Sequence, residues 1–351
     1  MKQMLRKMTL LSIAAAIVFL ACESQHFTGA KVYIQQSNWE KAIEQLKIET
    51  GMNPANAEAW WLLAECYAKT KKFTDMNHAL NECVKADPTP TRKENVQNLR
   101  HNEWVPYYNS AVAALQKKDF AASIEKINKA IEVNADKPEN YVNLGIIYIQ
   151  MDSLDLAMPH FDKALGMLTP PKTKSDSTLY LTALKDKAAI YMNKKDNENS
   201  LKTYQQVVEF APTDALAWIS IGNCYDLNKD YENSQKAYSK ASELEPDNKN
   251  IWYNIGVSFF QVKNHPEAIK AFEKVVAIDP DDKDALYNLS MLFTLEKQWD
   301  NALPHLEKLK VIDPDNKDIW QLLGTVYVNK NMKDEGAKAF DRAKELENQT
   351  N

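Results

Sequence analysis

The chain has 351 residues, of which 44% are hydrophobic and 26% charged, a balance typical of a protein that folds in water. Only 8 residues are glycine, and the abundant alanine, leucine, lysine and glutamate favour helix, because these side chains lose little rotamer freedom there. A formal net charge of −5 provides no basic excess to meet phosphates, which argues against a nucleic-acid partner. We therefore expect an all-α protein that does not bind nucleic acid.

The N-terminal segment, residues 1–21, has the composition of an export signal. A basic start with Lys2, Arg6 and Lys7 precedes an apolar run that ends at Ala21. The run is shorter than the roughly 17 to 25 residues that a spanning helix needs, and it fits a signal-peptide core. We expect this segment to be cleaved, which leaves 40 basic and 48 acidic residues and a net charge of −8.

The residues from Val18 to Cys22 read VFLAC and resemble the lipobox of bacterial lipoproteins. In that motif a small residue, here Ala21, precedes a cysteine whose thiol receives diacylglycerol; Phe19 stands where the commonest lipobox has leucine. The resemblance implies that Cys22 is the acylated first residue (lipid attachment, including palmitate) of a protein held in the bacterial cell envelope. Glu23 in place of an aspartate favours the outer membrane, facing the periplasm or the cell surface. The alternative is an ordinary signal peptide, or an uncleaved anchor, with a chance cysteine.

A 34-residue period runs through the rest of the chain. Trp218, Trp252 and Trp320 are separated by one and then by two periods. An aromatic residue follows seven positions after each, at Tyr225 and its equivalents. A fixed period of this length predicts a stacked repeat architecture.

The repeated residues resemble the tetratricopeptide repeat, whose first helix carries W-x-x-L-G-x-x-Y. Counted from Ala215 as position 1, the first-helix signature falls at positions 4, 7, 8 and 11, and the second-helix signature of small, aromatic, small and proline residues falls at positions 20, 24, 27 and 32. The resemblance implies an α-solenoid, a right-handed superhelix of about nine helical hairpins. The two signatures are clearest as Trp218, Ile221, Gly222 and Tyr225, and as Ala268, Phe272, Val275 and Pro280.

The register divides the chain into three runs of repeats. Repeats 1–2 occupy residues 22–90, repeats 3–4 residues 104–171, and repeats 5–9 residues 181–351. Between them, residues 91–103 are polar but compatible with helix and are interpreted as a helical or polar insertion. Residues 172–180 follow two consecutive prolines and are predicted to form a loop.

Glycine and proline recur at fixed repeat positions for physical reasons. We expect glycine at position 8, as in Gly145, Gly222, Gly256 and Gly324, to let the two helices of a hairpin approach closely. Proline at position 32 lacks an amide donor and ends the second helix. The six such prolines are Pro54, Pro88, Pro212, Pro246, Pro280 and Pro314.

The sequence offers no pattern for catalysis or for a cofactor. Cys66, Cys83 and Cys224 stand at repeat positions where alanine usually packs, so we expect buried thiols, with a Cys66 to Cys83 disulfide as the alternative. The histidines lack metal-ligand spacing, and phosphate loops and nucleophile elbows are absent. We predict no enzyme activity, no cofactor and no metal ion.

The resemblance also implies a binding surface. In the family the first helices line the concave face, with positions 2, 5, 9, 12 and 13 pointing into it, and apolar surface with aromatic anchors suits a peptide. The alternative is that packing between repeats buries several of these side chains. The candidate peptide-binding residues are Ile219, Asn223, Tyr253, Val257, Phe260, Tyr287, Met291 and Leu295.

A further family feature is a clamp of basic residues and asparagine that grips a C-terminal carboxylate. Lys185 and Asn223 fit two of its members, but Asn250 and Asn254 stand where basic residues are required. We therefore do not expect this clamp.

These observations lead to one main functional hypothesis. We expect a membrane-anchored scaffold that binds a protein or peptide during envelope assembly. One alternative is a structural spacer or self-associating element whose groove is unused, and a remote one is an envelope enzyme acting on glycans, which would need a convergent pair of acids. The sequence leaves the oligomeric state and the identity of the partner open.

Overall fold

The structure is a computed structural model that describes residues 23–349, and every secondary-structure element within that range is an α-helix. The predicted signal peptide, residues 1–21, and the predicted lipid-attachment residue Cys22 lie outside the described residues. The all-α prediction is confirmed for the described part of the chain.

The helices fall into two compact units that divide between Pro170 and Pro171. The first unit contains α2 (Gln25–Gln35), α3 (Trp39–Met52), α4 (Ala57–Lys69), α5 (Phe73–Ala86), α6 (Pro90–Gln116), α7 (Phe120–Val133), α8 (Pro138–Gln150) and α9 (Leu154–Leu168). The second contains α10 (Lys174–Asn193), α11 (Asn197–Phe210), α12 (Ala215–Leu227), α13 (Tyr231–Leu244), α14 (Lys249–Gln261), α15 (His265–Ile278), α16 (Lys283–Leu295), α17 (Trp299–Ile312), α18 (Lys317–Asn329) and α19 (Lys333–Gln349).

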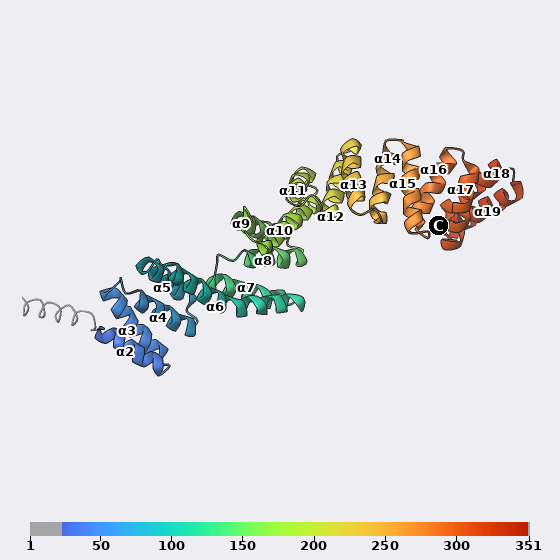
Figure 1. Ribbon diagram of the computed structural model, residues 1–351. Coiled ribbons are helices and arrows are strands. Elements are labelled where there is room, and N and C mark those ends of the chain that lie inside the picture. The colour runs from blue at the N-terminus through green and yellow to red at the C-terminus, as the bar shows by residue number, and fades with distance from the viewer. Residues whose placement is uncertain (1–22, 350–351) are drawn as a thin grey trace, which may run out of the picture. The chain divides into compact units, whose positions relative to one another are not determined.

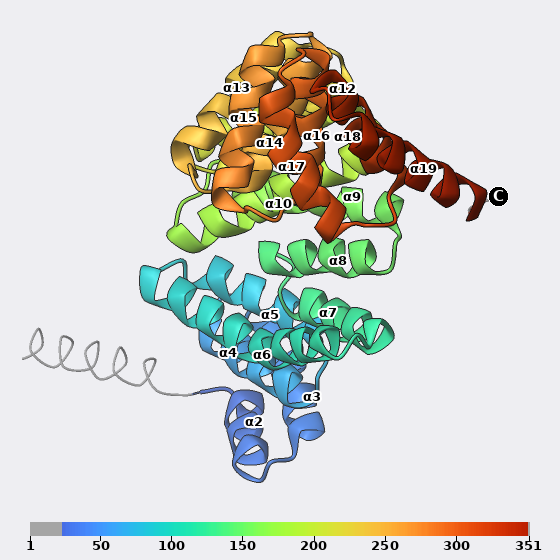
Figure 2. The same cartoon turned by 90° about the vertical axis from the view of Figure 1, so that its right-hand side faces the viewer.

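Successive helices pair into nine hairpins, from α2 with α3 to α18 with α19. Within each unit the two helices of a hairpin lie side by side, as Figure 1 and the turned view in Figure 2 both show. Each hairpin also contacts the next along the chain within its unit. The prediction of a solenoid of about nine hairpins is confirmed.

The core of each unit lies between its helices, in clusters of buried side chains that each span more than one hairpin. In the first unit it includes the fully buried Leu46 and Phe73. In the second it includes Phe272, Leu286 and Leu306, which come from three successive helices, α15 to α17. No hairpin buries its apolar stripes alone, which is why the repeats stack.

The position-8 glycines are packing residues, as predicted. A Cβ atom added to any of the four would lie no farther than 2.8 Å from an aromatic ring of the paired second helix, well inside the contact distance of two carbon atoms. The opposed pairs are Gly145 with Phe161, Gly222 with Tyr238, Gly256 with Phe272, and Gly324 with Phe340.

A residue with a left-handed backbone lies two positions after the end of each first helix, and these residues keep the repeat register. The φ angle is 60° at Lys195, 59° at Lys229, 58° at Lys263 and 58° at Lys297, positions 34 residues apart. The amide of the following residue then reaches back along the helix, as in the bond from Asp230 N to Tyr225 O of 2.9 Å, a Schellman-type ending.

In four of the nine described hairpins a tryptophan at position 4 ties the hairpin to the turn that precedes it. Its indole N–H donates a hydrogen bond to the carbonyl oxygen of the position-32 proline six residues earlier. Where Leu286 replaces the tryptophan, Lys308 Nζ donates to Pro280 O instead, at 2.5 Å. The indole bonds run from Trp60 to Pro54 (3.0 Å), Trp218 to Pro212 (2.9 Å), Trp252 to Pro246 (2.7 Å) and Trp320 to Pro314 (2.7 Å).

The two segments between the runs of repeats are both largely helical. Residues 91–103 extend α6 toward its N-terminus and give it 27 residues. The loop predicted over residues 172–180 is wrong from Lys174 onward, because α10 begins there. Thr173 and Asp176 form a capping box that satisfies the first amides of the helix, with Thr173 Oγ1 accepting from Asp176 N at 3.0 Å.

The three described cysteines are free and buried. Cys83 Sγ donates to Ala57 O at 3.3 Å, and burial raises the pKa of the Cys66 thiol to about 11. The alternative of a bridge between Cys66 and Cys83 is therefore wrong.

Over residues 23–349, no helix has the length and apolar character needed to cross a membrane.

Candidate peptide-binding surface

The eight predicted surface residues all lie on three first helices of the second unit. Ile219 and Asn223 are on α12, Tyr253, Val257 and Phe260 on α14, and Tyr287, Met291 and Leu295 on α16. Seven of them are partly buried, and Leu295 retains 55% of its exposure. Their role in binding stays a prediction.

Packing between helices occupies part of these side chains, as the alternative reading proposed. The ring of Tyr253 meets that of Phe272 edge to face, with centroids 5.5 Å apart. Phe260 stacks on His265 at 5.9 Å. Ile219 packs against the apolar cluster around Tyr238. The aromatic residues therefore hold the hairpins together as well as reaching the surface.

A polar network connects α12, α13 and α14 beside these residues. The hydroxyl oxygen of Tyr238 lies 2.6 Å from Asn223 Oδ1 and 2.9 Å from Asp226 Oδ2, so its single proton serves one acceptor at a time. Asn254 Nδ2 donates to the same Asn223 Oδ1 at 3.5 Å. Burial, and then the neighbouring Asp226 carboxylate, raise the pKa of Tyr238, which keeps the phenol protonated as a donor.

Sequence reasoning did not identify Tyr238 as part of this region. The aromatic residue at position 24 was read only as a core residue, and its ring does pack in the core, being 1% exposed. The sequence did contain a sign of this role. Position 24 is Tyr238 in this repeat but phenylalanine in others, at Phe161 and Phe272, so the hydroxyl group of Tyr238 is the difference. A tyrosine in a buried phenylalanine position requires a hydrogen-bonding partner.

Two of the first helices end in the same kind of residue pair, at positions 12 and 13. The pairs are Asp226 with Leu227 on α12 and Thr294 with Leu295 on α16. Asp226 Oδ1 and Thr294 Oγ1 are buried and have no hydrogen-bonding partner within the described residues. The adjacent leucines are 59% and 55% exposed. Each of the two exposed leucines is therefore next in the chain to a residue with a buried and unsatisfied oxygen atom.

The side chains that fitted two positions of a carboxylate clamp are already engaged. Lys185 Nζ lies 3.0 Å from Asp214 Oδ2, and Asn223 is held by Tyr238.

In the part of the chain that the structure describes, no group of three or more His, Cys, Asp or Glu residues is placed to hold a metal ion.

Comparison with known protein families gives consistent matches along the chain. Three family models, each described as tetratricopeptide repeat, together match well over half of the 351 residues. The matched segments are residues 27–75, 106–137, 138–167, 186–214, 215–248, 250–282, 268–317 and 317–350.

Individual proteins are only distantly similar. Anaphase-promoting complex subunit 3 of Schizosaccharomyces pombe is 22% identical over 191 residues, which are 54% of this chain and 25% of that protein. The chain therefore spans about a quarter of the length of this curated relative.

Two solved structures match this chain to different degrees. The C-terminal part of a repeat-containing protein from Cytophaga hutchinsonii has a TM-score of 0.58 and 17% identity, covering 68% of this chain and 95% of that one. A tetratricopeptide repeat protein from Parabacteroides merdae has a TM-score of 0.49 and 19% identity, covering 69% and 93%. The first of these likenesses supports the fold and nothing further.

Proposed function

The chain belongs to the tetratricopeptide repeat family, and from that premise we propose that it is a membrane-anchored scaffold of the bacterial cell envelope. In this proposal the exposed face of α12, α14 and α16 binds a protein or peptide partner during envelope assembly. The chain itself carries out no catalytic step and needs no cofactor.

The repeated pairs at positions 12 and 13 carry this proposal. Each exposed leucine leaves apolar surface in contact with water. A polypeptide partner supplies apolar side chains that cover Leu227 and Leu295. The unpaired oxygen atoms of Asp226 and Thr294 are shielded from solvent and do not contact the partner. Two such pairs on helices of the same unit favour an extended or helical segment as the occupant.

The test uses the two leucines rather than the tyrosines, because Tyr253 also packs on Phe272. Leu227→Ala combined with Leu295→Ala removes exposed side chains only, so the change in stability stays within about 0.5 kcal/mol per site. Partners are cross-linked to the full-length protein in membranes and identified by mass spectrometry, and the purified partner is then titrated by calorimetry. We expect the double variant to weaken its binding by roughly tenfold or more.

The control is Val311→Ala, which removes a side chain that is 76% exposed on the second helix α17 and should leave binding unchanged. Equal binding by the leucine variant would refute the proposed surface. Recovery of nothing but further copies of the chain, in assemblies that dissociate on dilution, would instead favour the self-associating element.

Membrane attachment rests on the sequence around Cys22. Cleavage before this residue and acylation of its thiol would hold the protein firmly, because each buried methylene contributes about 0.8 kcal/mol and several acyl chains act together. In the same experiment, Cys22→Ala should abolish incorporation of labelled palmitate and release the protein from the membrane fraction. Labelled, membrane-bound Cys22→Ala protein would disprove the anchor.

A further inference from the structure

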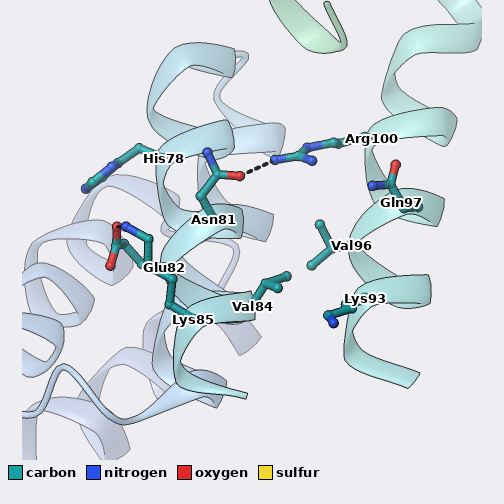
Figure 3. Close-up of a pocket in the computed structure, with 9 residues that line it drawn as sticks. All are labelled: His78, Asn81, Glu82, Val84, Lys85, Lys93, Val96, Gln97 and Arg100. Atoms are coloured by element: carbon teal, nitrogen blue, oxygen red, sulfur yellow. Dashed lines mark hydrogen bonds and ion pairs between the residues drawn. The ribbon is translucent and has the colours of Figure 1, made fainter. Parts of the chain in front are cut away.

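A pocket of about 550 Å³ opens between α5 and the N-terminal part of α6, in the first unit (Figure 3). Its origin is the insertion in the repeat pattern. Residues 90–103 extend α6 beyond the length of α7, with which the rest of α6 pairs. Within this extension only Val96 is buried, so the helix stands beside α5 without closing the space between them.

The lining of the pocket is basic around a small apolar centre. Figure 3 shows Val84 on α5 and Val96 on α6 turned toward each other across the gap. Lys85, Lys93 and Arg100 line the pocket, and its one acidic lining residue, Glu82, is already paired with Lys85 at 2.6 Å. The pocket thus has an excess of positive charge, although the mature chain as a whole is acidic.

Arg100 is held in place across the pocket by neutral groups. Its Nε donates to Asn77 Oδ1 at 2.9 Å and its Nη2 to Asn81 Oδ1 at 2.7 Å, and the second bond is visible in Figure 3. Asn77 is itself fixed, because its Nδ2 donates to the carbonyl oxygens of Glu132 and Val133 at 3.0 Å each. The guanidinium of Arg100 is therefore held in one orientation. Only two of its five N–H donors are used in these bonds.

The other two arginines of residues 23–349 are each paired with two carboxylates. Arg92, on the same helix α6, contacts Glu58 Oε2 at 3.1 Å and Asp87 Oδ2 at 3.3 Å. Arg342 contacts Asp315 and Glu345 at 3.1 and 3.2 Å. Among these three arginines of the described chain, Arg100 alone makes no ion pair with a carboxylate.

The missing partner has a physical cost. Burial lowers the pKa of Arg100, and the more distant Asp136 offsets only part of that effect. A half-buried cation is stabilised most by a carboxylate that accepts two parallel hydrogen bonds from the guanidinium. A carboxylate brought by a ligand would supply this interaction at a site already shaped for it.

We propose that the pocket between α5 and α6 binds an acidic segment of a partner protein, with one carboxylate on Arg100 and a second near Lys93. These two residues are seven positions apart on α6, which is about 10.5 Å along the helix. Four residues of extended chain cover about 13 Å and place the first, third and fifth side chains on one face, a length that the flexible Lys93 side chain accommodates. The preferred segment therefore has two acidic residues four positions apart, with an apolar residue midway between them that meets Val84 and Val96.

This inference goes beyond the proposed function. The pocket lies in the first unit, and none of its residues belongs to the surface on α12, α14 and α16. Each site is tested by variants that leave the other unchanged.

The first test measures fluorescence polarisation of a labelled peptide, Gly-Glu-Ser-Val-Ser-Glu-Gly, with the full-length protein. The comparison peptide carries glutamine in place of both glutamates. We expect the acidic peptide to bind, more weakly as ionic strength rises, and the glutamine peptide not to bind. Arg100→Gln should weaken binding of the acidic peptide by roughly tenfold or more, and Lys93→Gln by a smaller factor.

Lys126→Gln is the matched control, because it removes the same charge from a partly exposed side chain on α7 whose ion pair is with the adjacent Glu125. It should bind the acidic peptide like the wild type. Loss of affinity equal to that of Arg100→Gln would show that only net charge matters, and would overturn the proposal.

A second variant separates loss of the site from loss of the fold. Asn81→Asp is nearly isosteric and places a carboxylate 2.7 Å from the guanidinium, where Asn81 Oδ1 now lies. The internal carboxylate should replace that of the ligand, so we expect unchanged or higher thermal stability together with loss of peptide binding. Full peptide binding by Asn81→Asp would contradict the assignment of Arg100.

Two further probes are a small soluble anion and an anionic lipid surface. Inorganic phosphate and vesicles of phosphatidylglycerol are each tested for binding that depends on Arg100. If either binds through Arg100 while the acidic peptide does not, the assignment to an acidic protein segment is overturned. Binding of the acidic peptide through Arg100, without comparable binding of phosphate or vesicles, supports the proposal.

Discussion

At the scale of single residues, the contact between glycine and an aromatic ring sets the distance between the two helices of a hairpin. The face of Phe272 occupies the space where a side chain at position 256 would begin. The helix accepts glycine here in spite of its helix propensity, which is about 1 kcal/mol poorer than that of alanine. Close packing of the hairpin therefore outweighs local helix stability at this position.

Gly256→Ala should destabilise the second unit. Alanine improves helix propensity by about 1 kcal/mol, but forcing a methyl group into the Phe272 ring costs about 1–3 kcal/mol through displaced side chains and backbone. Chemical denaturation followed by circular dichroism measures the balance. Gly166→Ala in α9 is the control, since nothing lies within 4 Å of the added atom, and it should stabilise the protein. Equal effects of the two changes would show that the ring does not limit the approach.

At the scale of the helical hairpin, two histidines at repeat position 23 pack on the aromatic residue of the facing first helix. His160 stacks on Tyr148 with centroids 5.4 Å apart, and His305 stacks on Phe293 at 5.9 Å. Burial lowers the pKa of both imidazoles from the usual 6.5. Lys163 adds to this effect at His160, whereas Glu273 opposes it and Lys308 adds to it at His305.

These hairpins should lose stability in mild acid. Between the lowered pKa of the folded state and 6.5, the unfolded chain binds more protons than the folded one. The stabilisation is therefore complete above about pH 6.5 and is lost as the pH falls below it. We expect a lower urea midpoint at about pH 5.5 than at about pH 7.5. His160→Phe with His305→Phe keeps the stacking and should reduce this difference.

The exposed His101 provides the control, as His101→Gln should leave the difference between the two midpoints as it is in the wild type. If the double variant shows the same loss as the wild type, groups other than these two histidines cause it.

At this scale the sequence predicted the repeated hairpins well and the segments between them less well. The period of 34 residues depends on packing residues such as Trp252 and Gly256, which every stacked hairpin needs. The start of α10 depends instead on a local cap, and the capping box of Thr173 and Asp176 was overlooked because two prolines precede it. Helix across residues 91–103 was anticipated only as one of two options, since that segment carries no repeat signature.

At the scale of the whole molecule, the described chain consists of two compact units joined through residues 169–173. This linking segment lies outside any helix, and Lys172 within it is exposed. Turns between hairpins inside each unit are held by hydrogen bonds such as that from Trp252 to Pro246. Exposed segments outside helices are the preferred sites of proteolytic cleavage.

Limited trypsin digestion should therefore cut first after Lys172 and yield two fragments that both remain helical. Intact-mass measurement identifies the cut, and circular dichroism of the separated fragments measures helix content. Lys172→Gln with Lys174→Gln should protect this segment without changing the helix content of the protein. Earlier cleavage inside a hairpin would show that one of the units opens more easily than the link.

The candidate sites differ in how far the sequence could predict them. The family resemblance placed Tyr253 and Tyr287 on first helices, but their division between packing and exposure depends on neighbouring helices. The unsatisfied oxygen of Asp226 is a property of three-dimensional packing and has no counterpart in spacing. Arg100 lies in an insertion outside the repeats, and its lack of a carboxylate partner became visible only when the positions of Asn77 and Asn81 were known.

The bonds between tryptophan and proline make the repeat array its own optical reporter. Of the eight tryptophans, four carry an indole bonded to the turn before a different hairpin, whereas hairpins with another residue at this position, such as Leu286, have no such reporter. The fluorescence emission of a variant that retains only one of these four tryptophans reports when water reaches that single contact between hairpins. In the second unit, which holds three of the four, a set of such variants would show whether unfolding begins at the C-terminal hairpin or in the middle, with no dye attached.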